Sequence, residues 1–231
     1  MRRKRPAVEQ DEDLAQVVTG HGPCTYLLLA LLALILIYPY LKAGVTSRVI
    51  LGLLYSLVLI GGAHAVGRDR RKLIVGLGLA IVGIGLQWSY LATHDIWLGR
   101  LTGITFVLFL LFPIGEVLAY ILKKGPITAD KLHGALAGYI MLAFLWAFFY
   151  TLIESFIPGS FVRGGARMDE QSSFLHLLYF SFTTLTTTGF GDITPVSEQA
   201  RSFAIIEEFI GVFFVGVLIA RLAGLYPPVK K

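Results

Sequence analysis

Six long apolar stretches, separated by short polar connections, dominate the pattern of this 231-residue chain. An α-helix needs about 20 residues to cross the hydrocarbon core of a bilayer, and longer stretches are expected to tilt. The pattern therefore predicts an all-α membrane protein with six transmembrane helices, of which the first is the shortest. The expected spans are Thr25–Leu41, Val45–Val66, Lys72–Ala92, Leu98–Leu122, Lys131–Phe156 and Ser202–Tyr226.

Composition indicates the same class of protein. Hydrophobic residues make up 55% of the chain and charged residues 15%, and the mean hydropathy of +0.72 is far above that of a soluble domain. A single cysteine, Cys24, excludes an intrachain disulfide. The pI near 9.3 does not indicate nucleic-acid binding, because the basic residues gather between the spans, where they set topology and contact lipid headgroups.

Lysine and arginine concentrate in alternate connections between the spans. Cytoplasmic loops carry an excess of these residues, so both termini are predicted to lie in the cytoplasm. This orientation places the connection between the fifth and sixth spans on the outer side. The basic positions that set it are Arg2, Arg3, Lys4, Arg5, Arg68, Arg70, Arg71, Lys72, Lys123, Lys124 and Lys131.

The connection between the fifth and sixth spans holds the most informative residues. Phe174–Phe182 is apolar and long enough for a short helix, expected to begin near Ser172 or Ser173, but not for a span. Thr184–Asp192 follows and reads Thr-Leu-Thr-Thr-Thr-Gly-Phe-Gly-Asp. Its glycines allow conformations that are closed to residues with a Cβ, in which neighbouring carbonyls point to one side. Such a strand offers a cation a ladder of oxygens in place of its hydration shell.

This stretch resembles the potassium-channel selectivity filter, usually written TVGYG and here Thr187-Thr188-Gly189-Phe190-Gly191. The short helix, the filter and the span after it resemble the pore unit of the potassium-channel family, and the whole layout is similar to the bacterial six-helix type. The resemblance implies K⁺ ions bound by the carbonyls of Thr187 to Phe190 and by the Thr187 hydroxyl, with no further cofactor. Because one chain carries one such strand, a ring of four oxygens predicts a homotetramer.

Two positions depart from the commonest filter pattern. Thr188 stands where valine is usual, so its hydroxyl is expected to need a partner. Phe190 stands where tyrosine is usual and lacks the phenol that can brace the filter.

Four further residues are candidates for filter support. The resemblance pairs Asp192 with a pore-helix residue thirteen positions earlier, here Tyr179, although a solvated turn aspartate is the alternative. Glu207 lies early in the sixth span, at filter depth, where it is expected to bond Thr183, Thr188 or the pore-helix backbone. A carboxylate at membrane depth is a functional hypothesis by default. Glu154, at the end of the fifth span, has two interpretations: a cap of the turret loop that follows or, as the favoured one, an interfacial carboxylate in contact with water.

The sixth span carries the candidate gate. Gly211 stands where the family keeps a hinge glycine, and it either permits a bend or lets the pore helix approach closely. Val215, Ile219 and Ala223 share a helical face with it. They are candidates for the inner constriction, where apolar side chains gate by dewetting, or else they face lipid. Gly216 is a second candidate for a close contact.

The charge pattern argues against strong voltage gating. A voltage sensor carries several arginines on its fourth helix, but the fourth span here has Arg100 at its outer edge and then no basic residue until Lys123. The expected organisation is a cytoplasmic tail over 1–20, a four-helix sensor-like domain without gating charges over 21–125, a pore domain over 126–226 and a short tail over 227–231. No ligand-binding cytoplasmic domain is expected on this chain, so control by one would need a separate subunit.

The sequence thus predicts a potassium-selective channel that conducts passively, in a bacterial or archaeal cell membrane and surrounded by lipid. The alternatives are a weakly selective cation channel, and an ion-coupled transporter or accessory subunit, although no paired interrupted helices are visible. An enzyme is not expected, because the histidines lack ligand spacing. They are His21, His64, His94, His133 and His176.

Overall fold

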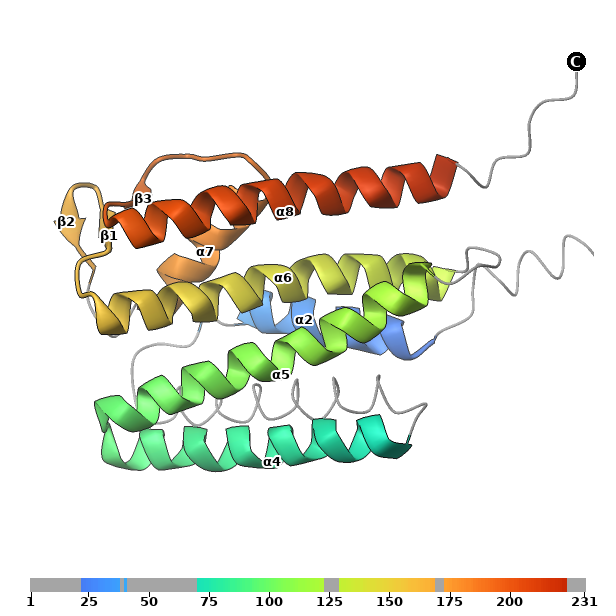
Figure 1. Cartoon of the computed structure of the whole chain (residues 1–231), viewed down its shortest axis with the longest axis horizontal. Coiled ribbons are helices and arrows are strands. Elements are labelled where there is room, and N and C mark those ends of the chain that lie inside the picture. Colours follow the sequence, from blue (N-terminus) through green and yellow to red (C-terminus); the bar gives the residue numbers. More distant parts are fainter. Residues whose placement is uncertain (1–21, 38–39, 41–69, 123–128, 169–172, 224–231) are drawn as a thin grey trace, which may run out of the picture.

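Helices form most of the computed structural model, which describes residues 22–37, 40, 70–122, 129–168 and 173–223. The long helices run side by side, and the short α7 lies between α6 and α8 (Figure 1). In chain order the elements are α2 (Pro23–Ile37), α4 (Arg70–Thr93), α5 (Ile96–Leu122), α6 (Ala129–Phe156), β1 (Phe161–Arg163), β2 (Ala166–Arg167), α7 (Ser173–Leu185), β3 (Ile193–Pro195) and α8 (Glu198–Ala223).

Four helices of the described part are long and apolar enough to cross a membrane, and they match the predicted third to sixth spans. The first predicted span corresponds to α2, which has 15 residues and is shorter than a spanning helix. The second, Val45–Val66, lies outside the described residues, so the count of six stays a prediction. The short helix expected before the filter is α7, and it begins at Ser173 as predicted.

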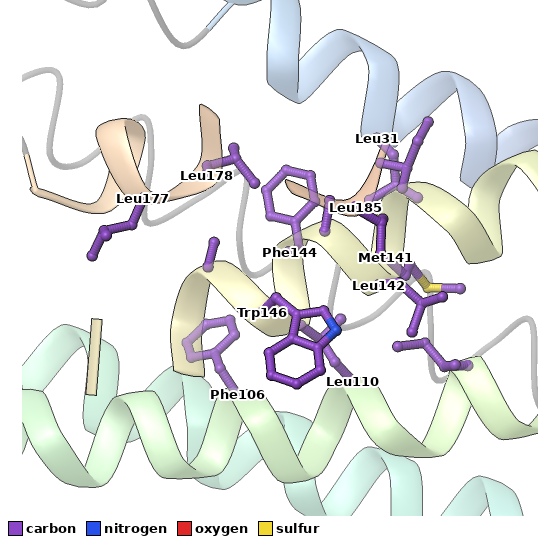
Figure 2. Packing of buried hydrophobic residues seen from close by; sticks show 14 of the residues in the cluster. Leu31, Phe106, Leu110, Met141, Leu142, Phe144, Trp146, Leu177, Leu178 and Leu185 are labelled. Carbon is purple, nitrogen blue, oxygen red and sulfur yellow. The ribbon is translucent and has the colours of Figure 1, made fainter. Parts of the chain in front are cut away.

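Helix α6 is the centre of the packing, because it contacts α2, α5, α7 and α8. Small residues let its neighbours approach, as is common between membrane helices. A Cβ added at Gly134 would lie 3.2 Å from the Cys24 sulfur on α2, and one at Gly138 would lie 3.3 Å from Val117 on α5. Figure 2 shows the resulting core, in which side chains of α2, α5 and α7 surround Phe144 and Trp146 of α6.

Helices α4 and α5 form a tight antiparallel hairpin. His94 ends α4 with a positive φ of 54°, and Asp95 caps α5 by accepting the backbone amides of Trp97 and Leu98 at 2.7 and 3.1 Å. Helix α5 then packs directly along α6 of the same chain, with Phe106 stacked on Phe148 at a centroid distance of 4.7 Å. Helix α5 of the predicted sensor-like domain therefore packs on α6 of its own chain.

A small three-stranded sheet, in the order β2-β1-β3, departs from the all-α expectation. Gly164 and Gly165, both at positive φ, make the tight turn between β1 and β2. Strand β3 follows the filter and pairs antiparallel with β1, which follows α6. The sheet thus ties the exit of the filter to the loop that leaves α6. Strands of two and three residues carry too little alternation to be recognised in the sequence, although the Gly-Gly pair was a turn signal.

Candidate functional site

The chain reverses direction immediately after α7, and backbone hydrogen bonds hold the reversal. The Thr183 carbonyl accepts the amides of Thr188 and Gly189 at 2.8 and 3.1 Å, and the Thr184 carbonyl accepts the amide of Thr187 at 2.9 Å. These carbonyls belong to the last turn of α7, where helix carbonyls lack partners within the helix. The segment after α7 is therefore anchored at its inner end to the helix that precedes it.

The backbone of this segment has a left-handed residue at every second position. Thr187, Gly189 and Gly191 have φ values of 57°, 52° and 76°. Alternation of this kind turns successive carbonyls to the same side of the strand, as a ladder of cation ligands requires. A Cβ at either glycine would meet no atom of the residues that the structure describes, so glycine is needed there for its conformation and not for space.

Thr187 is a branched residue held in the same unfavourable region. Such strain costs about 1–3 kcal/mol and persists where the surroundings impose it, often at functional sites. The hydrogen bond from the Thr187 amide to the Thr184 carbonyl supplies that constraint, together with the neighbouring hydrogen bonds to the Thr183 carbonyl. In the single chain, residues 186–192 are exposed, so their carbonyls are open to ions or to other copies.

The Thr188 hydroxyl, which departs from the usual filter pattern, has a partner. It lies 2.9 Å from the Thr186 hydroxyl, which donates to the Phe182 carbonyl at 2.7 Å. Because the Thr186 proton is used in that bond, Thr188 donates to Thr186. The extra hydroxyl is thus accommodated within the chain.

Two side chains flank the outer end of the segment. The Tyr179 ring stacks on the Phe190 ring, with a centroid distance of 6.2 Å and an interplanar angle of 6°. Desolvation raises the pKa of Tyr179, as do the charge of Asp192 and its hydrogen bond with the phenol. The backbone carbonyl of Asp192 accepts the Gly164 amide at 3.0 Å. Asp192 therefore joins the segment both to α7 and to the sheet.

Glu207 of α8 is fully buried behind α7. It accepts the Tyr150 hydroxyl of α6 at 2.5 Å and lies 2.5 Å from the Ser181 hydroxyl of α7. In the described residues, Glu207 thus bonds two side chains and none of the expected partners, which were Thr183, Thr188 and the pore-helix backbone. Tyr150 and Ser181 were not singled out in the sequence, where the only signal was a polar group in an apolar helix.

Gly211 of α8 lies against the C-terminal end of α7. A Cβ there would be 2.0 Å from the Leu185 carbonyl oxygen, too close for any side chain. The same oxygen accepts the Tyr139 hydroxyl of α6 at 2.9 Å. The structure thus gives Gly211 the close-approach role, and the hinge stays a prediction. Gly216, the second candidate for a close contact, has no atom of the described residues within 4 Å of the added Cβ, so the described part of the single chain shows no such contact.

The candidate constriction residues lie along the C-terminal half of α8. Val215 and Ile219 are 40% and 59% exposed in the single chain, so neither is covered by its own helices. Ala223 ends α8, and its side chain lies outside the described residues. Their roles stay predictions.

Glu154 has the less favoured of its two expected roles. Its two carboxylate oxygens accept the amides of Gly159 and Phe161 at 2.6 and 3.0 Å. The half-buried carboxylate therefore caps the turn that leads from α6 into β1, whereas the favoured interpretation was a carboxylate in contact with water. The partners come from a turn that only the folded loop brings back to the helix end.

The comparisons with known proteins converge on one family. A family described as "Ion channel" matches residues 138–226. The potassium channel protein Kcv of Paramecium bursaria Chlorella virus 1 is 35% identical over 68 residues, which are 29% of this chain and 71% of that protein. The chain belongs to the potassium channel family. It is an integral membrane protein, and its relatives are ion channels and not enzymes.

Other potassium channels share shorter fractions of their length with this channel. The voltage-gated potassium channel Kch of Escherichia coli K12 is 32% identical over 101 residues, 44% of this chain and 24% of that protein. Two pore potassium channel b of rice, Oryza sativa subsp. japonica, is 41% identical over 49 residues, 21% of this chain and 14% of that protein. No solved structure matches the channel.

Proposed function

We propose that the channel conducts K⁺ selectively and passively through a pore made by four copies of the chain. The observation that carries the proposal is the left-handed backbone at Thr187, Gly189 and Gly191, in an exposed strand between a short helix and a spanning helix. That conformation serves no packing contact at either glycine. It is the conformation that presents a column of carbonyl oxygens.

The proposed ion sites are built from backbone oxygens. The carbonyls of Thr187, Thr188, Gly189 and Phe190, with the Thr187 hydroxyl, replace the water around each K⁺ ion. Gly191 keeps the outer end in the same conformation. The C-terminal end of α7 adds a partial negative charge that favours a cation in the cavity below. Since one strand covers one side of the ion, the complete site requires four chains.

The surface of α8 is suited to this assembly. Large apolar side chains along it are 58–70% exposed in the single chain, and exposed apolar area of this kind marks a surface covered by lipid or by another protein. These five side chains are Ile205, Phe209, Val212, Phe213 and Ile219.

We assign residues 126–226 to the pore domain and residues 21–125 to the sensor-like domain, with both termini in the cytoplasm.

The channel is proposed to respond weakly to voltage. Arg100, the basic residue of α5, donates to the Ser155 carbonyl at the end of α6 at 2.5 Å. Its guanidinium also lies over the rings of Trp97 and Phe156, at 4.7 and 4.4 Å from their centroids. A charge held in this way is an anchor between the outer ends of two helices. It does not provide the several mobile charges that steep voltage dependence requires.

Flux in proteoliposomes tests the proposal. We expect the purified channel to carry K⁺ down its gradient, with block by barium, and to carry little Na⁺ under the same gradient. Replacing Gly189 with alanine should abolish the flux, because a Cβ at a φ of 52° is strained by about 1–2 kcal/mol. Equal Na⁺ and K⁺ flux would favour the weakly selective channel, and flux that needs a second ion gradient would favour the transporter.

A further inference from the structure

The carboxyl group of Glu207 lies where three helices of the pore domain meet. Glu207, Tyr150 and Ser181 come from α8, α6 and α7, and each is 0% exposed. Tyr150 donates to one carboxyl oxygen, and Ser181 lies within hydrogen-bond distance of the other. One buried group of α8 is thus bonded to both of the other helices.

The arrangement around Ser181 favours a neutral carboxyl group. The Ser181 hydroxyl lies 2.9 Å from the Ala143 carbonyl oxygen as well as 2.5 Å from Glu207. A serine hydroxyl has one proton to donate. When Ser181 donates it to Ala143, Glu207 must carry a proton of its own and donate it to Ser181. A carboxylic acid therefore satisfies every acceptor in the cluster.

The charges around Glu207 favour the same state. The titratable groups that act on it are Glu208, next to it on α8, and the phenols of Tyr150 and Tyr139 from α6. In the described part of the chain, no basic side chain is among them. A buried carboxylate without a counter-charge is strongly unfavourable, whereas the neutral acid is satisfied by its hydrogen bonds.

The cluster is linked to the filter through α7. Ser181 precedes Thr183 by two residues in the same helix, and the Thr183 carbonyl accepts the amides of Thr188 and Gly189. The position of Ser181 against α8 therefore determines where the inner end of the filter stands.

We propose that Glu207 is a positioning residue for selective conduction: a neutral carboxylic acid that joins the inner helix to the pore helix and thereby holds the filter in place. This inference rests on the proposed function, because it assumes that residues 187–191 are the ion-selective element. It adds the residue that couples that element to α8, and the protonation state in which the coupling works.

Four variants separate the bond from the bulk of the side chain. Glu207→Gln keeps a neutral group that can donate to Ser181 and accept from Tyr150, whereas Glu207→Leu keeps only volume. Ser181→Ala removes the same bond from the other side and covers the case in which the leucine variant fails to fold. Glu208→Gln, at the adjacent and exposed carboxylate, is the matched control.

The readout is the ratio of K⁺ to Na⁺ flux in proteoliposomes. We expect this ratio to fall about fivefold or more in Glu207→Leu and Ser181→Ala, the factor that corresponds to one net hydrogen bond of about 1 kcal/mol. The glutamine variant should recover most of the wild-type ratio, and the Glu208→Gln control should match the wild type. A wild-type ratio in Ser181→Ala, or a glutamine variant as impaired as the leucine variant, would overturn the proposal.

Infrared spectroscopy tests the protonation state independently of conduction. We expect the carboxylic-acid C=O stretch in the wild type and in Glu208→Gln, and its loss in Glu207→Gln. A band of unchanged intensity in Glu207→Gln, or the absence of the band from the wild type, would show that Glu207 is ionised. Absence of any K⁺ flux in the wild type would instead overturn the proposed function. The infrared result would then still decide the protonation state of Glu207.

Discussion

Replacing Gly211 with alanine tests whether this glycine is a packing contact or a hinge. The added Cβ would lie 2.0 Å from the Leu185 carbonyl oxygen and 2.9 Å from its carbonyl carbon. Both atoms are backbone, so no side-chain rotation relieves the clash. Either α8 or the end of α7 must retreat by about 1 Å, since Cβ atoms essentially never come closer than 3.0 Å to another heavy atom.

The expected cost follows from the contacts at this point. Forcing an extra methyl group into a packed site costs about 1–3 kcal/mol. Moving the Leu185 carbonyl also weakens its 2.9 Å hydrogen bond with Tyr139, which is worth about 0.5–1.5 kcal/mol. Together these give about 2–4 kcal/mol, or roughly a 30-fold to 1,000-fold shift in the folding equilibrium. The displaced α7 carries the filter, so K⁺ flux should fall as well.

The assay is thermal unfolding of the purified protein in detergent, followed by K⁺ flux in proteoliposomes. Gly216→Ala is the matched control, because it makes the same change on the same helix at a position with no atom within 4 Å of the new Cβ. We expect Gly211→Ala to unfold at a clearly lower temperature than Gly216→Ala. Equal unfolding temperatures would refute the packing argument, and reduced flux at equal stability would point to the hinge.

Three other changes have defined expectations. Glu154→Gln leaves one oxygen acceptor where two backbone amides now donate. It should therefore lower the free energy of unfolding by about 1–3 kcal/mol, measured by thermal unfolding. The control Glu198→Gln, on the exposed surface, should leave this free energy unchanged. Arg100→Gln removes the hydrogen bond to the Ser155 carbonyl but no gating charge. The current–voltage relation of the channel, recorded in a planar bilayer, should therefore keep its shape. A shift of its midpoint would contradict this expectation. Thr188→Val removes the exposed hydrogen bond between the Thr188 and Thr186 hydroxyls. The ratio of K⁺ to Na⁺ flux should change less than twofold, because the proposed ion ligand at this position is the backbone carbonyl. A larger change would implicate the side chain.

The sequence alone determined the features that are written in neighbouring residues. The apolar stretches predicted the spanning helices, because the length of a helix follows from the run of residues that a bilayer accepts. Gly189 and Gly191 predicted the left-handed backbone at their own positions, because glycine permits it, whereas the positive φ at Thr187 emerged only from the structure. The short helix before it was recognised in the same way, from its length and its boundary at Ser173.

The tertiary structure decided which residues support that segment. The sequence placed Glu207 at the right depth but named the wrong partners, because the rotation of α8 and its crossing with α7 select Ser181 over Thr183. The sequence left two roles open for Gly211, a hinge and a close contact with α7. The approach of the Leu185 carbonyl shows the close contact. The sheet was missed because β1 and β3 lie on either side of α7. The cap at Glu154 was the less favoured interpretation, because its partners Gly159 and Phe161 come from a turn that only the folded loop brings back to the end of α6. Partners of this kind depend on how helices rotate and cross, which is set by packing across the whole pore domain and not by local pattern.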